Sequence, residues 1–178
     1  MIRIVMFDLG LTLIDEQNRP FAHVPEAVTA ISKLKTSDRK PLQCCLVSDF
    51  TMATPPVTPK KIRPRFEEYL EVLDQTGLRP LFEPVDRRVT LSTHANAFKP
   101  DRAVFETALR RLRSRATLDE CVLITENTAH IKAARTTLRM QALQFSATSS
   151  QPFDFDDWAQ APAMVARLVN PLVVGHKS

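Results

Sequence analysis

The stretch VMFDLGLTLID, residues 5–15, determines how the rest of the chain is interpreted. Residues 5–7 of this stretch are the end of a mostly apolar segment, residues 2–7. That segment predicts a buried β-strand. Asp8 follows this segment directly, and Gly10 and Thr12 come next. Two interpretations of Asp8 are open: a covalent nucleophile at the end of a strand, or a carboxylate that only caps the following turn.

Short apolar segments alternate with amphipathic ones along the whole chain. Further strands are predicted at 42–47, 89–93, 121–125 and 141–145. Five helices are predicted: one that begins at Pro25, one over 66–73 that ends at Gly77, one that Asp101 caps at its N-terminus, one over 131–138 and one over 154–169. Pro162 lies inside the last of these and indicates a short first turn or a break. The four prolines of residues 51–64 predict an irregular loop. This alternation predicts an α/β fold: a three-layer, doubly wound, Rossmann-like domain with a mostly parallel five-stranded sheet.

The length of 178 residues predicts one domain with a proper core, and 44% hydrophobic with 25% charged residues is ordinary for a globular protein. We expect a single domain over 1–178, with a basic flap loop at 49–64 and a C-terminal loop and helix at 146–178. The spacing between Asp8, Ser48 and Lys99 leaves no room for a separate lid domain.

Location and partners are inferred from composition. No signal peptide is recognisable at the N-terminus, and no segment approaches the ~20 apolar residues of a membrane span. Three cysteines, of which Cys44 and Cys45 are adjacent, suit a reducing compartment, so we expect a cytoplasmic protein without membrane contact.

The net charge is +4, and basic residues cluster at 60–63, 87–88 and 110–115. Such clusters can attract anions or nucleic acid, but no aromatic residues interleave with them, so nucleic-acid binding is not expected. Only three glycines occur, which excludes a glycine-rich phosphate loop.

Four polar residues fall where strands end or in the loop beyond one. Asp8, Ser48 and Glu126 directly follow the first, second and fourth predicted strands, and Lys99 lies in the loop beyond the third. Because ligands of parallel sheets bind at the carboxyl ends of the strands, we expect these four side chains at one edge of the sheet.

Taken in order, these segments resemble the four motifs of the haloacid dehalogenase (HAD) superfamily of hydrolases. MFDLGLTLI resembles the first motif, which carries the nucleophilic aspartate, and CLVSDF the second, a strand that ends in Ser or Thr. FKPDRAVFETAL resembles the third, with a lysine before Pro-Asp, and CVLITENTAHIKAARTTLRM the fourth, which usually contains Gly-Asp and a second Asp. The resemblance spans residues 2 to about 145.

The resemblance implies a role for each matched residue. Asp8 would attack phosphorus and form a mixed anhydride. Lys99 would offset the charge of Asp8 and of an anionic substrate, Ser48 would donate a hydrogen bond to a phosphoryl oxygen, and Thr12 would contribute to substrate binding. Mg²⁺, or alternatively Mn²⁺ or another divalent metal, would be held by the Asp8 carboxylate, the Gly10 carbonyl and Glu126.

Three positions depart from the pattern. Gly10 stands where the phosphatases of the superfamily usually have an acid that protonates the leaving group, a role worth roughly 10²–10⁴-fold in rate. Thr125-Glu126 replaces Gly-Asp, and His130 replaces the second Asp. His130 is interpreted in three ways: as a metal ligand, as a base that replaces the acid missing at Gly10, or as a solvent-facing helix residue.

The sequence therefore predicts a metal-dependent phosphatase that acts through an aspartyl-phosphate intermediate. Two alternatives stay open: a carbon–halogen hydrolase with the same nucleophile, because halide leaves without a proton, and a degenerate HAD-like domain that binds or regulates without turnover. The expected partner is a phosphorylated substrate, either a small molecule or a larger one, and a homodimer is one option for the assembly.

Overall fold

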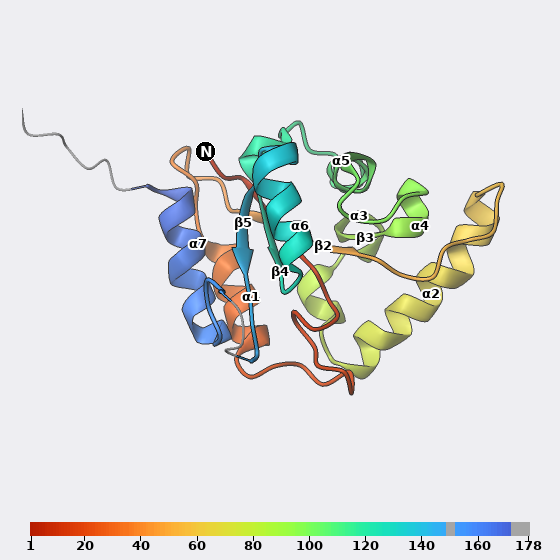
Figure 1. Ribbon diagram of the computed structural model, residues 1–178, viewed down its shortest axis with the longest axis horizontal. Coiled ribbons are helices and arrows are strands. Elements are labelled where there is room, and N and C mark those ends of the chain that lie inside the picture. The colour runs from red at the N-terminus through yellow and green to blue at the C-terminus, as the bar shows by residue number, and fades with distance from the viewer. Residues whose placement is uncertain (149–151, 172–178) are drawn as a thin grey trace, which may run out of the picture.

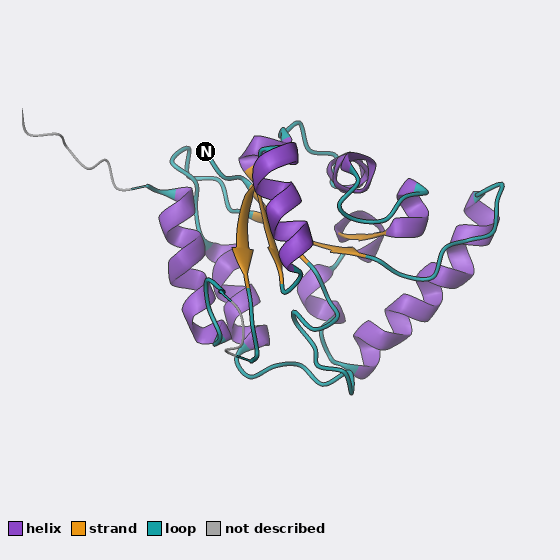
Figure 2. Ribbon diagram, viewed as in Figure 1, coloured by secondary structure: helices purple, strands orange, loops and turns teal. Residues whose placement is uncertain are grey.

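One sheet of five parallel strands forms the centre of the molecule, whose computed structural model describes residues 1–148 and 152–171. The strands are β1 (Ile4–Phe7), β2 (Gln43–Ser48), β3 (Val89–Leu91), β4 (Cys121–Thr125) and β5 (Gln141–Gln144). Their order is β3-β2-β1-β4-β5, and every neighbouring pair is parallel. The predicted α/β class with a doubly wound, Rossmann-like sheet is confirmed (Figure 2).

Helices cover both faces of this sheet (Figure 1). They are α1 (Val24–Lys33), α2 (Pro59–Gln75), α3 (Val85–Arg88), α4 (Ser92–Ala95), α5 (Arg102–Arg111), α6 (Thr128–Ala133) and α7 (Ala161–Val169); a π-helical turn, Ala134–Leu138, continues α6, and 3₁₀ turns occupy Arg79–Phe82, Leu118–Glu120 and Trp158–Gln160. The helices α1 and α7 contact each other on one face, whereas α5 and α6 pack on the other.

The alternation of side chains along the strands creates two separate cores. In β1, Val5 and Phe7 face the core beneath α1 and α7, while Ile4 and Met6 face the core beneath α5 and α6. All four side chains are fully buried. A strand buried on both faces explains why the segment is apolar throughout rather than alternating with polar residues.

The prediction of an irregular loop over 51–64, and with it a flap loop over 49–64, is wrong for its last third. Helix α2 already begins at Pro59, so Lys60, Lys61 and Arg63 lie on its first turns. Proline suits a first turn because the amide hydrogens there have no partner within the helix. Pro64 lies further inside the helix and is exposed. The buried stripe of α2, which includes Tyr69 and Leu73, outweighs the loss of one hydrogen bond.

The third strand is also shorter than the predicted 89–93. It ends at Leu91, and the short helix α4 begins at Ser92. The amide of Leu91 donates to Nδ1 of His94 over 3.0 Å, a side-chain contact that turns the chain out of the sheet. Side-chain to backbone bonds of this kind compete with strand pairing and leave no trace in hydrophobic periodicity.

The C-terminal region agrees with the prediction of a loop and a helix where it is described. A 3₁₀ turn precedes α7, whose first turn contains Pro162, as its position in the sequence indicates. Residues 149–151 and 172–178 of the expected segment 146–178 lie outside the described residues. Within residues 1–148 and 152–171, no helix is both long and apolar enough to cross a membrane.

The strand order reverses direction at the centre of the sheet. From β1 the chain proceeds outward through β2 and β3, and it then returns to the other side of β1 with β4. Open parallel sheets bind ligands at such a reversal, beyond the carboxyl ends of the two strands. We use the name crevice for this region, between the residues that follow β1 and those that follow β4.

Candidate active site

Asp8 lies at this crevice, directly after β1. Its amide donates to the carbonyl of Ile124 in β4 over 3.0 Å, which fixes the backbone at the reversal point. Its Oδ1 accepts the amide hydrogen of Leu9 over 2.9 Å, and its Oδ2 accepts the hydroxyl of Thr125 over 3.1 Å. The residue is only 8% exposed, so its charge depends on these partners.

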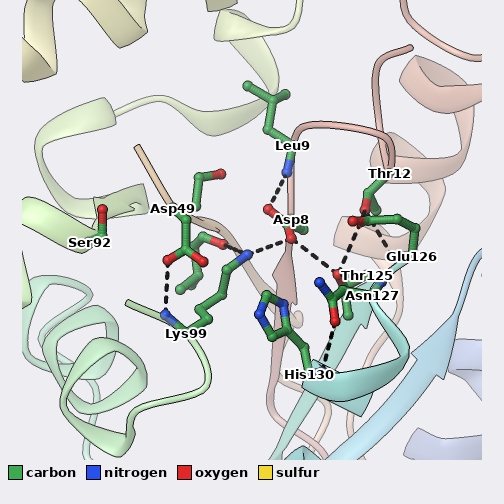
Figure 3. A network of polar contacts seen from close by, with 12 residues as sticks. Asp8, Leu9, Thr12, Asp49, Ser92, Lys99, Thr125, Glu126, Asn127 and His130 are labelled. Carbon is green, nitrogen blue, oxygen red and sulfur yellow. Dashed lines mark hydrogen bonds and ion pairs between the residues drawn. The ribbon is translucent and has the colours of Figure 1, made fainter. Parts of the chain in front are cut away.

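Lys99 provides the opposite charge. Its Nζ lies 2.5 Å from Oδ2 of Asp8 and donates to the carbonyl of Val47 at the end of β2 over 3.0 Å. The side chain is 1% exposed, against 12% for that of Asp8. Asp49 holds the loop, because its Oδ1 accepts the amide hydrogen of Lys99 over 2.9 Å (Figure 3). Residues far apart in sequence thus form a buried ion pair.

Glu126 approaches Asp8 from the other side of the crevice. The hydroxyl of Thr125 lies 3.1 Å from Oδ2 of Asp8 and 3.2 Å from Oε2 of Glu126, so one hydroxyl links the two carboxylates. Thr12 fixes Glu126 in two ways: its hydroxyl donates to Oε2 over 2.5 Å and accepts the Glu126 amide hydrogen over 3.1 Å. Trp158 in turn donates to the Thr12 carbonyl over 3.0 Å. Thr12 is fully buried and positions Glu126; its role in substrate binding stays a prediction.

Ser48 ends β2 as expected, but its hydroxyl already has a partner. The Ser48 hydroxyl and the Tyr69 hydroxyl are 2.6 Å apart, and both residues are about 2% exposed. Burial raises the pKa of Tyr69 far above its ordinary value, so the phenol stays protonated. The predicted hydrogen bond from Ser48 to a phosphoryl oxygen stays a prediction, and it requires Ser48 to share its hydroxyl with Tyr69.

His130 lies in the first turn of α6, and Figure 3 shows its imidazole beside the Lys99 side chain, below Asp8. Asn127 caps this helix, because its Oδ1 accepts the amide hydrogens of Ala129 and His130. The Nδ1 atom of His130 is buried and has no hydrogen-bond partner among the described residues. The side chain is half-buried, with its Nδ1 side turned into the protein, and its role stays a prediction.

The charges around His130 determine its protonation. Burial, and next the Lys99 ammonium, lower the pKa of His130, while the carboxylates of Asp8, Asp49 and Glu126 partly oppose this change. A lowered pKa favours the neutral ring near pH 7, and one of the two nitrogens of a neutral imidazole accepts a proton.

The oxygen atoms of the crevice fit Mg²⁺, although sparsely. Within residues 1–148 and 152–171 no three His, Cys, Asp or Glu side chains form a group that could hold a metal ion. Two carboxylates, on Asp8 and Glu126, meet through Thr125. Mg²⁺ is usually bound through one or two carboxylates and keeps several waters, so the carboxylates of Asp8 and Glu126 fit it, and the Gly10 carbonyl as a further ligand stays a prediction. The nitrogen of His130 does not suit Mg²⁺.

Sequence reasoning misses several residues that contribute to the site. It places Tyr69 only inside the helix predicted over 66–73, and it treats Thr125 only as a departure from a motif. Asp49 carries a usable signal, because it immediately follows Ser48 at a strand end. The partners of Tyr69 and Thr125 lie 21 and 117 residues away in sequence, so no local pattern could indicate them.

Comparisons with known proteins agree with the fold. No family model matches the chain, and no curated protein matches it. Solved structures do match, and the L-2-haloacid dehalogenase from Xanthobacter autotrophicus is 12% identical with a TM-score of 0.63, over 93% of this chain and 98% of that one. An uncharacterized protein from Corynebacterium glutamicum is 14% identical with a TM-score of 0.54, over 95% of this chain and 96% of that one.

Larger proteins match as well. The putative HAD-hydrolase YfnB from Bacillus subtilis, whose structure is bound to magnesium, is 10% identical with a TM-score of 0.59, over 86% of this chain. The chain spans 57% of that protein, and 52% of a haloacid dehalogenase-like hydrolase from Xanthomonas campestris. At these identities the matches show the fold alone. The chain has the fold of HAD-like hydrolases, as the motif resemblance implies.

Proposed function

We propose that this protein is a hydrolase of phosphate esters that forms an aspartyl-phosphate intermediate on Asp8. One observation carries the proposal: the Asp8 carboxylate lies between the buried ammonium of Lys99 and a second carboxylate, Glu126, at the reversal point of the sheet. A nucleophilic carboxylate needs a nearby cation to accept an anionic substrate, and the second carboxylate gives a metal ion a place beside it.

The side chains around Asp8 favour attack from a fixed position. The Leu9 amide, the Thr125 hydroxyl and Lys99 all contact the carboxylate, which restricts its rotation before substrate arrives. Lys99 would also attract the phosphoryl oxygens and hold them beside Asp8. Asp8, Glu126 and the Gly10 carbonyl would hold Mg²⁺, or Mn²⁺ in its place, and the bound ion would offset the negative charge of the phosphoryl group.

His130 is our candidate for the proton transfer that Gly10 cannot perform. Its ring lies beside Lys99, and its buried Nδ1 has no partner in the described part of the chain. As a neutral base it would accept a proton from the water that hydrolyses the intermediate. We expect His130→Asn to lower kcat by about 10²–10⁴-fold.

The pH profile separates this role from metal binding. Because the pKa of His130 is lowered from its ordinary value, the wild-type rate should stay constant around pH 7 and fall only below about pH 6.5. His130→Asn should lose this acidic limb while keeping the same magnesium requirement. A variant that needs more magnesium but keeps the acidic limb would assign His130 to the metal instead.

The experiment for the proposed function is hydrolysis of a generic aryl phosphate with and without added Mg²⁺ or Mn²⁺. We expect metal-dependent phosphate release in the wild type and none in Asp8→Asn. Asp49→Asn is the matched control, because it removes a carboxylate from the same site while the amide oxygen can still accept the Lys99 amide hydrogen. Equal rates in wild type and Asp8→Asn with every metal would refute the proposal.

Carbon–halogen hydrolysis is the second candidate, favoured by the small number of acids in the crevice. A halide leaves without a proton and the reaction needs no metal, so Gly10 would then be no deficiency. Metal-independent release of halide from 2-haloacids would decide for it. A shift in melting temperature with phosphate or Mg²⁺, without turnover of either substrate, would instead identify a degenerate binding or regulatory domain.

The expected partners and location belong to the same proposal. We propose that the partner is a phosphorylated substrate. A measurement of the molecular mass in solution tests whether the protein forms a homodimer. The cytoplasm, as a reducing compartment, suits the thiols of Cys44, Cys45 and Cys121, which are free and buried. Burial raises the pKa of Cys44 and of Cys121 to about 12, so these two thiols stay protonated and unreactive.

A further inference from the structure

A cavity lined by charged and polar residues lies at the end of the sheet opposite to Asp8. Its volume is about 630 Å³, which lies within the range of about 300–1,000 Å³ found for small-molecule sites. Its lining comes mainly from segments that precede β1, β2, β3 and β4, whereas Asp8 and Glu126 follow their strands and Ser48 ends β2. Since the strands are parallel, the cavity and the crevice open at opposite edges of the sheet.

Basic side chains dominate this cavity, which we call the basic hollow. Its charged lining residues are Arg3, Lys40, Arg88, Arg113, Arg115 and Asp38. Five cations against one carboxylate leave a formal charge of +4. The chain brings them together from four separate segments, and Figure 1 shows the connection after α5, which carries Arg113 and Arg115, at the same end as the N-terminus.

Three of these guanidinium groups have no counter-ion within residues 1–148 and 152–171. Arg3 pairs with Glu120 over 2.8 Å, and Lys40 pairs with Asp38 over 3.4 Å. Among the described residues, the side chains of Arg88, Arg113 and Arg115 form neither an ion pair nor a hydrogen bond. Like charges gathered in one hollow repel one another, and a bound anion would relieve that repulsion.

The chemistry of the lining identifies the class of anion. A guanidinium group presents its N–H donors in a planar fork that matches two phosphate oxygens. One phosphate group carries about two negative charges, so a ligand with at least two phosphate groups is needed to balance three unpaired guanidinium groups. The hollow has hydroxyl donors, such as Ser114, but no aromatic side chain on which a nucleobase of RNA or DNA could stack.

We propose that the basic hollow binds a small molecule that carries a chain of two or more phosphate groups. This inference is independent of the proposed hydrolysis at Asp8, because no residue is shared by the two sites. A ligand in the hollow leaves the crevice open to substrate.

Isothermal titration calorimetry with inorganic tripolyphosphate tests the proposal. We expect one equivalent to bind to the wild type, and binding to weaken by about 10- to 100-fold in Arg113→Gln/Arg115→Gln. Both side chains are exposed, so the double variant should keep the wild-type melting temperature. Arg113→Lys/Arg115→Lys keeps both charges without the planar forks and should weaken binding by a smaller factor.

Lys132→Gln/Arg139→Gln is the matched control. It also removes two exposed charges, and Arg139 has a left-handed backbone (φ 59°) like that of Arg113 (φ 54°). We expect this control to bind like the wild type, and Asp8-dependent hydrolysis to be the same in all of these variants.

Four results would overturn the proposal. Absence of binding to the wild type at millimolar tripolyphosphate would remove it. Unchanged affinity in Arg113→Gln/Arg115→Gln would place the ligand elsewhere, and equal weakening in the control would reduce the effect to overall charge. Tighter binding of a 20-nucleotide RNA, lost in the same variant and steeply dependent on salt, would identify a nucleic-acid surface instead.

Discussion

The ion pair between Lys99 and Asp8 can be tested by a double-mutant cycle. In Asp8→Asn the ammonium of Lys99 keeps the Val47 carbonyl as its partner but loses its counter-ion, and its side chain is only 1% exposed. Removing one partner of a buried pair typically costs about 3–5 kcal/mol, because the remaining charge is uncompensated. We expect a loss of this size in the free energy of unfolding.

The opposite variant should cost less. In Lys99→Met the Asp8 carboxylate keeps the Leu9 amide and the Thr125 hydroxyl, and 12% of its side chain contacts water. We expect a loss of about 1–3 kcal/mol. The double variant leaves no buried charge at the pair, so it should be more stable than Asp8→Asn alone. The coupling energy should therefore exceed the loss in Lys99→Met, so it should be at least about 1 kcal/mol.

Urea unfolding at pH 7 measures all four proteins. Trp158 is the only tryptophan and is buried, so its fluorescence reports unfolding directly. Asp49→Asn serves as the control and should change stability by less than about 1 kcal/mol. If the two single losses simply add in the double variant, or if Asp8→Asn is as stable as the wild type, the buried ion pair does not hold the site together.

Other contacts support three further predictions. Glu126→Gln should raise the magnesium concentration for half-maximal hydrolysis by about tenfold or more, measured by metal titration, with an unchanged requirement arguing against Glu126 as a ligand. Burial lowers the pKa of His94 to about 4, so the free energy of unfolding should be at its full value above about pH 6.5 and fall by up to about 3 kcal/mol toward pH 4. In urea titrations across that range, His94→Gln should reduce this dependence on pH. An unchanged dependence in the variant would exclude His94 as its cause. Tyr69→Phe leaves the buried Ser48 hydroxyl without its partner and should cost about 1–3 kcal/mol in urea unfolding; a wild-type midpoint would show that Ser48 finds another partner.

The order of the elements was predictable because the central strands β1 and β4 are buried on both faces. Such strands are continuous apolar runs, and Cys121–Thr125 was predicted at the observed bounds. The predicted ends of strands and helices are wrong where a side chain competes with the backbone hydrogen-bond pattern. The contact from the Leu91 amide to His94 ends the third strand early, and prolines near a helix start resemble loop prolines.

The sequence by itself determined the α/β alternation and the positions of Asp8 and Lys99. Both are local information: the hydrophobic period indicates the elements, and the parallel arrangement gathers the residues after each strand at one edge of the sheet. Only the tertiary structure decided what each polar side chain contacts. Thr12 is committed to Glu126, and the run at 110–115 divides, with Arg111 over the ring of Phe66 while Arg113 and Arg115 line the basic hollow. The physical reason is that these partners lie far apart in sequence, so their contacts exist only after the sheet has formed.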